Sequence, residues 1–207
     1  MVKAENSVMV ILAAGKSSRM GRPKQLLPWG NRTLLGHVIQ QSITTGFQKT
    51  IVVLGAYEKH IRSTLANYPV QYLFNKKWEE GMGSSIALGA SYLLSKDHLN
   101  YQGVLISLGD QPFVDISYYK KMLATYTKGK CQIIATSYGH KSGVPALFDP
   151  YYLKGLSNLK GPEGAAQLIS QNKENVLSLP ADFKTTDIDT EEQYMKLHKI
   201  FLQQAGN

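Results

Sequence analysis

The chain has 207 residues, of which 43% are hydrophobic and 18% charged, a balance typical of one folded domain and unlike that of a disordered chain. Its formal net charge of +8 favours anionic partners, but the 23 lysines and arginines are spread along the sequence, which indicates small anions rather than nucleic acid. A single cysteine excludes an intrachain disulfide and a thiolate metal cluster. Because the sequence contains neither a signal-peptide pattern nor an apolar run of about 18 residues, we expect one cytoplasmic domain over residues 1–207 with no membrane partner.

Short apolar runs alternate with amphipathic patterns from residue 8 onward, which predicts an α/β fold with a mostly parallel central sheet and helices on both faces. The first helix is expected to follow Thr33, whose hydroxyl can cap it, and to end at Gly46. Further helices are expected to begin at Ser84 or Ser85, at Asp115 and at the capping-box pattern of residues 190–193. Strands are predicted at residues 8–12, 50–54, 70–74, 104–108, 133–137, 144–148 and near 184–188.

The segment after the first predicted strand has the composition of a phosphate-binding loop. In an open parallel sheet, ligands bind beyond the carboxyl ends of the strands, where unpaired N–H groups are available. Ala13, Ala14 and Gly15 are small enough for close approach of a ligand to the backbone, and Arg19 and Lys24 add cations. A P-loop is excluded because the position five residues before Gly15 is a valine inside the strand. Taken alone, the segment also fits an ordinary basic turn.

A carboxylate follows another predicted central strand, since Asp110 comes after residues 104–108. An acid at the carboxyl end of such a strand can bind Mg²⁺, which bridges phosphate oxygens and offsets charge in phosphoryl transfer. Aspartate before a turn is also common for structural reasons, so Asp110 gains meaning from its combination with the first loop. Together, the two features indicate metal-assisted nucleotidyl transfer.

Four segments together resemble the molybdenum cofactor nucleotidyltransferase family of MobA-like NTP transferases. They read LAAGxSxRMGxPK at residues 12–24, GMGSS at 81–85, DQP at 110–112 and DIDT at 187–190. The likeness covers nearly the whole chain, and the first motif is the most specific. Ala14 is similar to the cytidylyltransferase, PucB-type branch, since guanylyltransferases carry glycine there. The resemblance implies a Rossmann-like three-layer sandwich of the nucleotide-diphospho-sugar transferase type.

The resemblance also implies a reaction: CMP passes from CTP to molybdopterin cofactor, giving molybdopterin cytosine dinucleotide and pyrophosphate, with Mg²⁺ as cofactor. It implies an apo-molybdoenzyme of the xanthine dehydrogenase type, linked to purine catabolism, as a further partner. The implied catalytic residues are Arg19, Lys24 and Asp110. Asp110 and Asp189 are the implied metal ligands, with Asp187 as the alternative to Asp189. The implied nucleotide contacts are Leu12, Ala13, Ala14, Gly15, Lys24, Gly81, Ser84 and Ser85, although Ser84 would also suit a helix cap.

Two other functions stay open at this point. A sugar-phosphate or polyol-phosphate nucleotidyltransferase would share the elements of the first loop. A non-catalytic carrier or insertion factor for molybdenum cofactor is suggested by residues 161–166, which read GPEGAA where cytidylyltransferases often read GDxGAR. Val144 likewise stands where the family usually has Asn or His. Both departures lie in the half expected to meet the acceptor, so the sequence predicts nucleotide use more firmly than acceptor identity.

Overall fold

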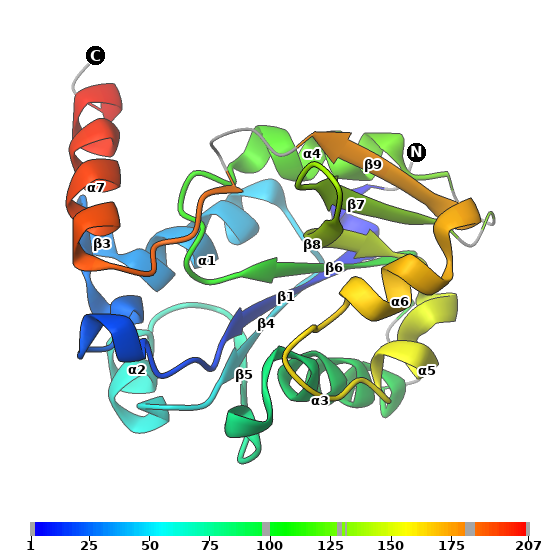
Figure 1. Cartoon of the computed structure of the whole chain (residues 1–207), viewed down its shortest axis with the longest axis horizontal. Coiled ribbons are helices and arrows are strands. Elements are labelled where there is room, and N and C mark those ends of the chain that lie inside the picture. The colour runs from blue at the N-terminus through cyan, green and yellow to red at the C-terminus, as the bar shows by residue number, and fades with distance from the viewer. Residues whose placement is uncertain (1–2, 97–99, 128–129, 131, 181–184, 206–207) are drawn as a thin grey trace.

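The computed structural model describes residues 3–96, 100–127, 130, 132–180 and 185–205. Its centre is a seven-stranded sheet in the order β5-β4-β1-β6-β8-β7-β9 (Figure 1). Strand β8 is antiparallel to β6 and β7, and every other neighbouring pair is parallel. The predicted mostly parallel α/β sheet is therefore confirmed. The strands are β1 (Ser7–Ala13), β4 (Lys49–Leu54), β5 (Gln71–Phe74), β6 (Gly103–Leu108), β7 (Ile133–Ser137), β8 (Ser142–Phe148) and β9 (Val176–Pro180).

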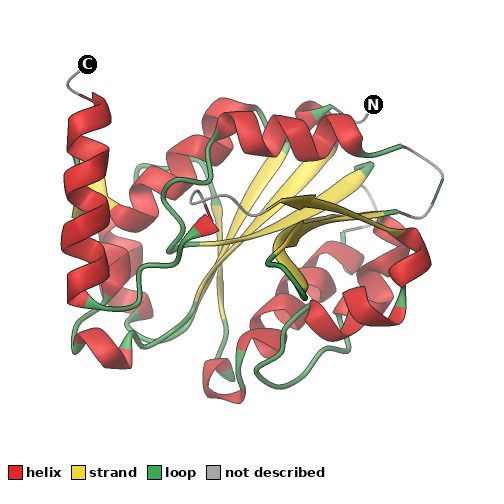
Figure 2. Cartoon of the chain, turned by 45° about the horizontal axis from the view of Figure 1, so that its top comes forward, coloured by secondary structure: helices red, strands yellow, loops and turns green. Residues whose placement is uncertain are grey.

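Helices cover both faces of this sheet and make a three-layer molecule (Figure 2). In β1, Met9 and Ile11 join the core on one face, whereas Val8 and Val10 join the core on the other. Because both faces are covered, β1 is a continuous apolar run and shows no alternation with polar residues. The first face carries α1 (Leu34–Thr45), α2 (Glu58–Thr64) and α4 (Ile116–Thr125), and the second carries α3 (Met82–Leu94), α5 (Leu153–Leu156) and α6 (Ala166–Gln171).

The C-terminal helix α7 (Glu191–Ala205) packs beside a small hairpin of β2 (Pro28–Trp29) and β3 (Arg32–Thr33) (Figure 1). Trp29 is fully buried there, with its ring 5.0 Å from that of Phe201 and 5.3 Å from that of His198. The hydroxyl of Tyr194 donates to the Pro28 carbonyl at 2.9 Å. This packing holds the segment that leads into α7 next to the loop after β1.

The predicted helix boundaries are confirmed at three places. Thr33 Oγ1 accepts a hydrogen bond from the N–H three residues on, and α1 ends at Gly46 with φ of 88°. The Asp115 carboxylate caps α4 in the same way. The capping box at α7 is reciprocal, since Gln193 Oε1 accepts from the Thr190 N–H and Thr190 Oγ1 accepts from the Gln193 N–H. Each cap satisfies N–H groups that the helix itself leaves unpaired.

The predicted start of the helix at Ser84 or Ser85 is wrong, because this helix, α3, begins at Met82. Gly81 precedes it with φ of 100°, and a Cβ at this position would lie 2.7 Å from the carbonyl carbon of Gly161. The close approach of a second chain segment therefore fixes where α3 begins. Ser84 and Ser85 lie inside its first turn.

The predicted strand near residues 184–188 is also wrong. Lys184 lies outside the described residues, and residues 185–188 form no strand. Their backbone pairs instead with the turn after β6: the Ile188 N–H donates to the Asp110 carbonyl, and Gln111 Nε2 donates to the Thr185 carbonyl. The edge strand next to β7 is β9 instead. No helix in the described part of the chain is long and apolar enough to cross a membrane.

Candidate active site

A cavity of about 480 Å³ opens at the carboxyl ends of β1 and β6. These ends are held together by the Gly109 N–H, which donates to the Leu12 carbonyl at 2.9 Å. Ser84 is the one predicted site residue that does not line the cavity. The structure brings together the other predicted residues, Leu12, Ala13, Ala14, Gly15, Arg19, Lys24, Gly81, Ser85, Asp110 and Asp189. They come from the loop after β1, the start of α3, the end of β6 and the segment before α7.

Gln25 fixes the shape of the loop after β1 and was missed by sequence reasoning. Its side chain is 3% exposed, and its Nε2 donates to the carbonyls of Ala13 and Gly15 at 3.1 and 2.9 Å. These two hydrogen bonds hold the loop in the shape that lines the cavity. A glutamine in a polar loop gives no sequence signal, because its role depends on how the chain turns back on itself.

Four charged residues form what we call the Lys24 cluster, namely Arg19, Lys24, Asp110 and Asp189. Lys24 Nζ lies 2.6 Å from Asp110 Oδ2 and 2.8 Å from Asp189 Oδ1. Arg19 Nη2 lies 2.9 Å from Asp189 Oδ2. The cations expected to bind phosphate are thus paired with the acids expected to bind metal. The two positive and two negative charges cancel. An incoming anion can replace the carboxylates as the partner of Arg19 and Lys24, and an incoming cation can replace Lys24 as the partner of the carboxylates.

Proton affinities follow from these contacts. Burial lowers the pKa of Lys24, but the charges of Asp110 and Asp189 and their hydrogen bonds outweigh burial and raise it overall. Burial raises the pKa of Asp189, but the hydrogen bond and charge of Lys24, followed by those of Arg19, lower it overall. Both groups are therefore ionised at neutral pH, as phosphate and metal binding require.

The acids of the Lys24 cluster suit Mg²⁺ by their chemistry. Asp110 Oδ1 is buried and has no hydrogen-bond partner among the described residues, while Oδ2 of the same carboxylate and Asp189 Oδ1 converge on Lys24 Nζ. Within the described residues, no group of three or more His, Cys, Asp or Glu could hold a metal alone. Mg²⁺ commonly takes one or two carboxylates and completes its shell with water and substrate phosphate. The residues present therefore fit a metal that is shared with a bound nucleotide.

Asp187 is a third acid in the cavity and differs from the other two. Gln111 Nε2 donates to Asp187 Oδ1 at 2.8 Å, so the side chain is held beside Asp110. Burial, followed by the negative charge of Asp110, raises the pKa of Asp187 to about 6, although the Gln111 hydrogen bond opposes the shift. Near neutral pH this carboxyl therefore changes its charge more readily than Asp189, whose pKa is lowered.

We expect Asp187→Asn to remove a pH dependence of stability. The folded pKa of about 6 lies above the unfolded value of 3.8, so protonated Asp187 stabilises the fold fully below pH 3.8, and this contribution is lost as pH rises through 6. Asparagine keeps an oxygen for Gln111 but does not titrate. The urea midpoint of the variant should therefore rise relative to wild type between pH 4 and pH 7. Parallel pH profiles of the two midpoints would contradict the assignment.

The start of α3 forms the opposite wall of the cavity, together with Trp78. The Ser84 Oγ lies 2.8 Å from the carbonyl oxygens of both Lys77 and Gly81, and its one hydrogen can be donated to either, which closes the turn that precedes the helix. Ser85 lines the cavity and is buried. Of the two serines, Ser85 is placed to meet a ligand, and Ser84 holds the turn.

Comparison with known proteins places these features in a family context. The model of the MobA-like NTP transferase domain matches residues 9–176. Nicotine blue oxidoreductase from Paenarthrobacter nicotinovorans is 29% identical over 200 residues, which cover 91% of this chain and 94% of that protein. The purine catabolism protein PucB from Bacillus subtilis is 26% identical over 201 residues, covering 89% and 92%. The bifunctional protein GlmU from Buchnera aphidicola is 30% identical over 138 residues, covering 66% of this chain but only 29% of GlmU.

Solved structures agree with the fold. A homologue of Mycobacterium tuberculosis Rv0371c from Mycobacterium sp. strain JC1 superposes with a TM-score of 0.82 at 27% identity, covering 96% of this chain and 98% of the other. Rv0371c of Mycobacterium tuberculosis in complex with manganese gives 0.74 at 26% identity, covering 94% and 98%. The molybdopterin-guanine dinucleotide biosynthesis protein A of Archaeoglobus fulgidus gives 0.67 at 15% identity, covering 95% and 99%, and at that identity it supports the fold alone.

Proposed function

The chain belongs to the MobA-like NTP transferase family and is a nucleotidyltransferase of that family, and we propose that it transfers CMP from CTP to molybdopterin cofactor. The Lys24 cluster supports the proposal most directly, because it places two cations and two carboxylates beside a small-residue loop at the carboxyl ends of β1 and β6. Charge complementarity to a triphosphate and its metal is the main requirement of phosphoryl transfer.

In the proposed reaction, an oxygen of the molybdopterin phosphate attacks the α-phosphorus of CTP, and the bond to the departing pyrophosphate breaks. The loop of Ala13, Ala14 and Gly15 lets the triphosphate approach the backbone closely. Arg19 and Lys24 turn toward the β- and γ-phosphates and neutralise the leaving group. Asp110 and Asp189 are the carboxylates that would hold Mg²⁺. When bound, Mg²⁺ would supply charge neutralisation at the phosphate oxygens.

Two relatives bear on the proposal, one on the client enzyme and the other on the metal. PucB is named for purine catabolism, and Rv0371c forms a complex with manganese, an ion that takes the same oxygen ligands as Mg²⁺. We therefore extend the proposal to a client apo-molybdoenzyme of the xanthine dehydrogenase type in the cytoplasm. The name nicotine blue oxidoreductase belongs to that relative, and one fold can carry several reactions. One assay of pyrophosphate release can therefore compare molybdopterin cofactor with sugar phosphates as acceptors.

Pyrophosphate release is expected only when CTP, Mg²⁺ and molybdopterin cofactor are all present. The measurement compares CTP, GTP and ATP with molybdopterin cofactor and with a panel of sugar phosphates and polyol phosphates. A site that hydrogen-bonds a base edge can discriminate between bases by about 10⁴-fold. Thermal shifts with each nucleotide report binding separately from turnover. Equal turnover of the three nucleotides would contradict cytidylyl transfer. Pyrophosphate release with a sugar phosphate in place of molybdopterin cofactor would identify the sugar phosphate as the acceptor. Binding of cofactor without turnover would indicate a carrier.

A further inference from the structure

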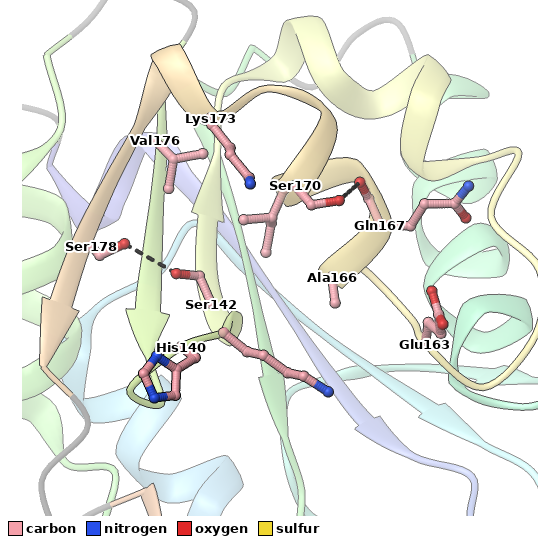
Figure 3. A pocket seen from close by; sticks show the side chains of 11 residues that line it. His140, Ser142, Glu163, Ala166, Gln167, Ser170, Lys173, Val176 and Ser178 are labelled. Carbon is pink, nitrogen blue, oxygen red and sulfur yellow. Dashed lines mark hydrogen bonds between the residues drawn. The ribbon is translucent and has the colours of Figure 1, made fainter.

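A cavity of about 710 Å³ between the β7–β8 loop and α6 (Figure 3) is separate from the candidate active site. The two cavities share no lining residue, and the lysines of this one, Lys141 and Lys173, are exposed. The acids of the Lys24 cluster are held instead by segments that join the small core between α7 and the β2–β3 hairpin. At the edge of that core lies His37, a partly buried residue of α1.

Two separate segments carry the acids of the Lys24 cluster. Asp110 lies in the turn after β6, and Asp189 lies in the segment that leads into α7. The Ile188 N–H donates to the Asp110 carbonyl at 3.1 Å, so the two segments are neighbours. Mg²⁺ demands near-ideal octahedral geometry, and a displacement of either segment would change the spacing of the two carboxylates. The contacts that hold both segments therefore control the site.

His37 holds the first of these segments through a hydrogen bond. Its Nε2 lies 3.1 Å from the carbonyl oxygen of Pro112, a buried residue two positions after Asp110. A carbonyl oxygen can only accept, so Nε2 carries the hydrogen of the neutral ring, whereas the Gln41 amide, 3.3 Å from the same nitrogen, can turn either of its ends toward it. Burial lowers the pKa of His37, the Pro112 hydrogen bond opposes this shift, and the charge of Arg32 lowers the pKa further, so the ring is neutral near pH 7.

The imidazole ring also contacts the helix that follows the second segment. Phe201 of α7 meets it edge to face, with ring centroids 5.3 Å apart and planes at 78°, and the Trp29 ring lies 6.3 Å away. Ile188 and Phe113 are buried in the same core, one from the segment before α7 and the other from the turn after β6. Aromatic pairs prefer particular arrangements, so they orient a helix as well as burying area. One side chain of α1 therefore contacts both the turn after β6 and α7.

We propose that His37 is a positioning residue that sets the spacing between Asp110 and Asp189. Its N–H anchors the turn that carries Asp110, and its ring anchors α7. Asp189 follows the position of α7, because its own N–H donates to Gln193 Oε1 in the first turn at 2.9 Å. His37 does not line the cavity, so it acts through these contacts. The inference rests on the proposed function, because it takes both acids to hold the metal that accompanies the nucleotide.

Three variants separate the hydrogen bond from simple packing. His37→Leu keeps an apolar side chain against Phe201 but removes the N–H. His37→Gln restores an N–H donor and serves as the rescue. His60→Leu changes an exposed histidine of α2 and is the matched control. All three are compared with wild type at pH 7, where the ring of His37 is neutral.

The first readout is amide hydrogen exchange followed by NMR, which needs neither substrate nor metal. The Ile188 N–H donates to the Asp110 carbonyl, so its exchange rate reports how firmly the two segments are joined. We expect this rate to rise about tenfold in His37→Leu, since loss of one hydrogen bond changes a local opening equilibrium by that order. The Gly109 N–H at the end of β6 is the internal reference, and the glutamine variant and the control should match wild type. Wild-type exchange in His37→Leu would overturn the proposal.

The second readout is the Mg²⁺ concentration that gives half of the rise in unfolding temperature in the presence of CTP. This concentration should increase about tenfold in His37→Leu, as for other residues that orient metal ligands, and return to the wild-type value in His37→Gln. A loss of packing alone would lower the unfolding temperature without changing the Mg²⁺ requirement. An unchanged requirement in His37→Leu would overturn the link to the two acids. Faster Ile188 exchange and a weaker Mg²⁺ response in that variant, without pyrophosphate release in wild type, would support the role of His37 and refute CMP transfer.

Discussion

Lys24→Met is expected to lower kcat for nucleotidyl transfer by about 10³-fold or more, the range found when a cation that stabilises a phosphoryl transition state is removed. Lys24 Nζ is the shared partner of Asp110 and Asp189, at 2.6 and 2.8 Å, and it is the cation closest to the centre of the cluster. Methionine preserves most of the side-chain volume but supplies no charge. Single-turnover measurements with CTP and molybdopterin cofactor isolate the chemical step.

The same variant should also change stability in a diagnostic way. Without Lys24, two carboxylates face one another, and we expect the free energy of unfolding to fall by about 2 kcal/mol, less than for a fully buried pair. Because these acids no longer have an ammonium partner, Mg²⁺ alone should raise the unfolding temperature of Lys24→Met more than that of wild type. Lys59→Met, which changes an exposed lysine of α2, serves as the control. An equal Mg²⁺ response in all three proteins would contradict competition between Lys24 and the metal.

Asp110→Asn is expected to lower kcat by about 10²–10³-fold while CTP still binds, as for loss of one preorganised electrostatic group. Asparagine retains the size of the side chain and one oxygen, but it removes the charge that faces Lys24 and would face Mg²⁺. The buried Oδ1 of Asp110 has no hydrogen-bond partner among the described residues, so the substitution breaks no other described contact at that atom.

The decisive measurement for Asp110 is the dependence of pyrophosphate release on Mg²⁺ concentration. The concentration for half-maximal activity should rise in Asp110→Asn, whereas Glu192→Gln, an exposed acid of α7, should match wild type. Full activity of Asp110→Asn at the wild-type Mg²⁺ requirement would remove Asp110 from the metal site. It would leave Asp187, Asp189 and Glu79 as the other acids that line the cavity.

Local patterns in the sequence were sufficient for the caps at Thr33, Asp115 and Thr190 and for six strands of the central sheet, namely β1, β4, β5, β6, β7 and β8. Each of these depends on residues within a few positions of one another, where periodicity and capping act directly. The start of α3 could not be read in this way. Its position depends on Gly81 lying against residue 161, which is 80 positions away in the chain.

The sequence by itself determined that a small-residue, basic loop follows the first strand and that Asp110 follows another central strand, and the carboxyl ends of parallel strands lie at one edge of a sheet. The structure shows that these two strands, β1 and β6, are neighbours. Only the tertiary structure decided how the charges of these segments pair. Lys24 reaches Asp189 because α7 packs on Trp29 and returns the chain to the loop, and Gln25 supports the loop from inside. Such contacts join residues that are far apart in sequence, so no local pattern encodes them.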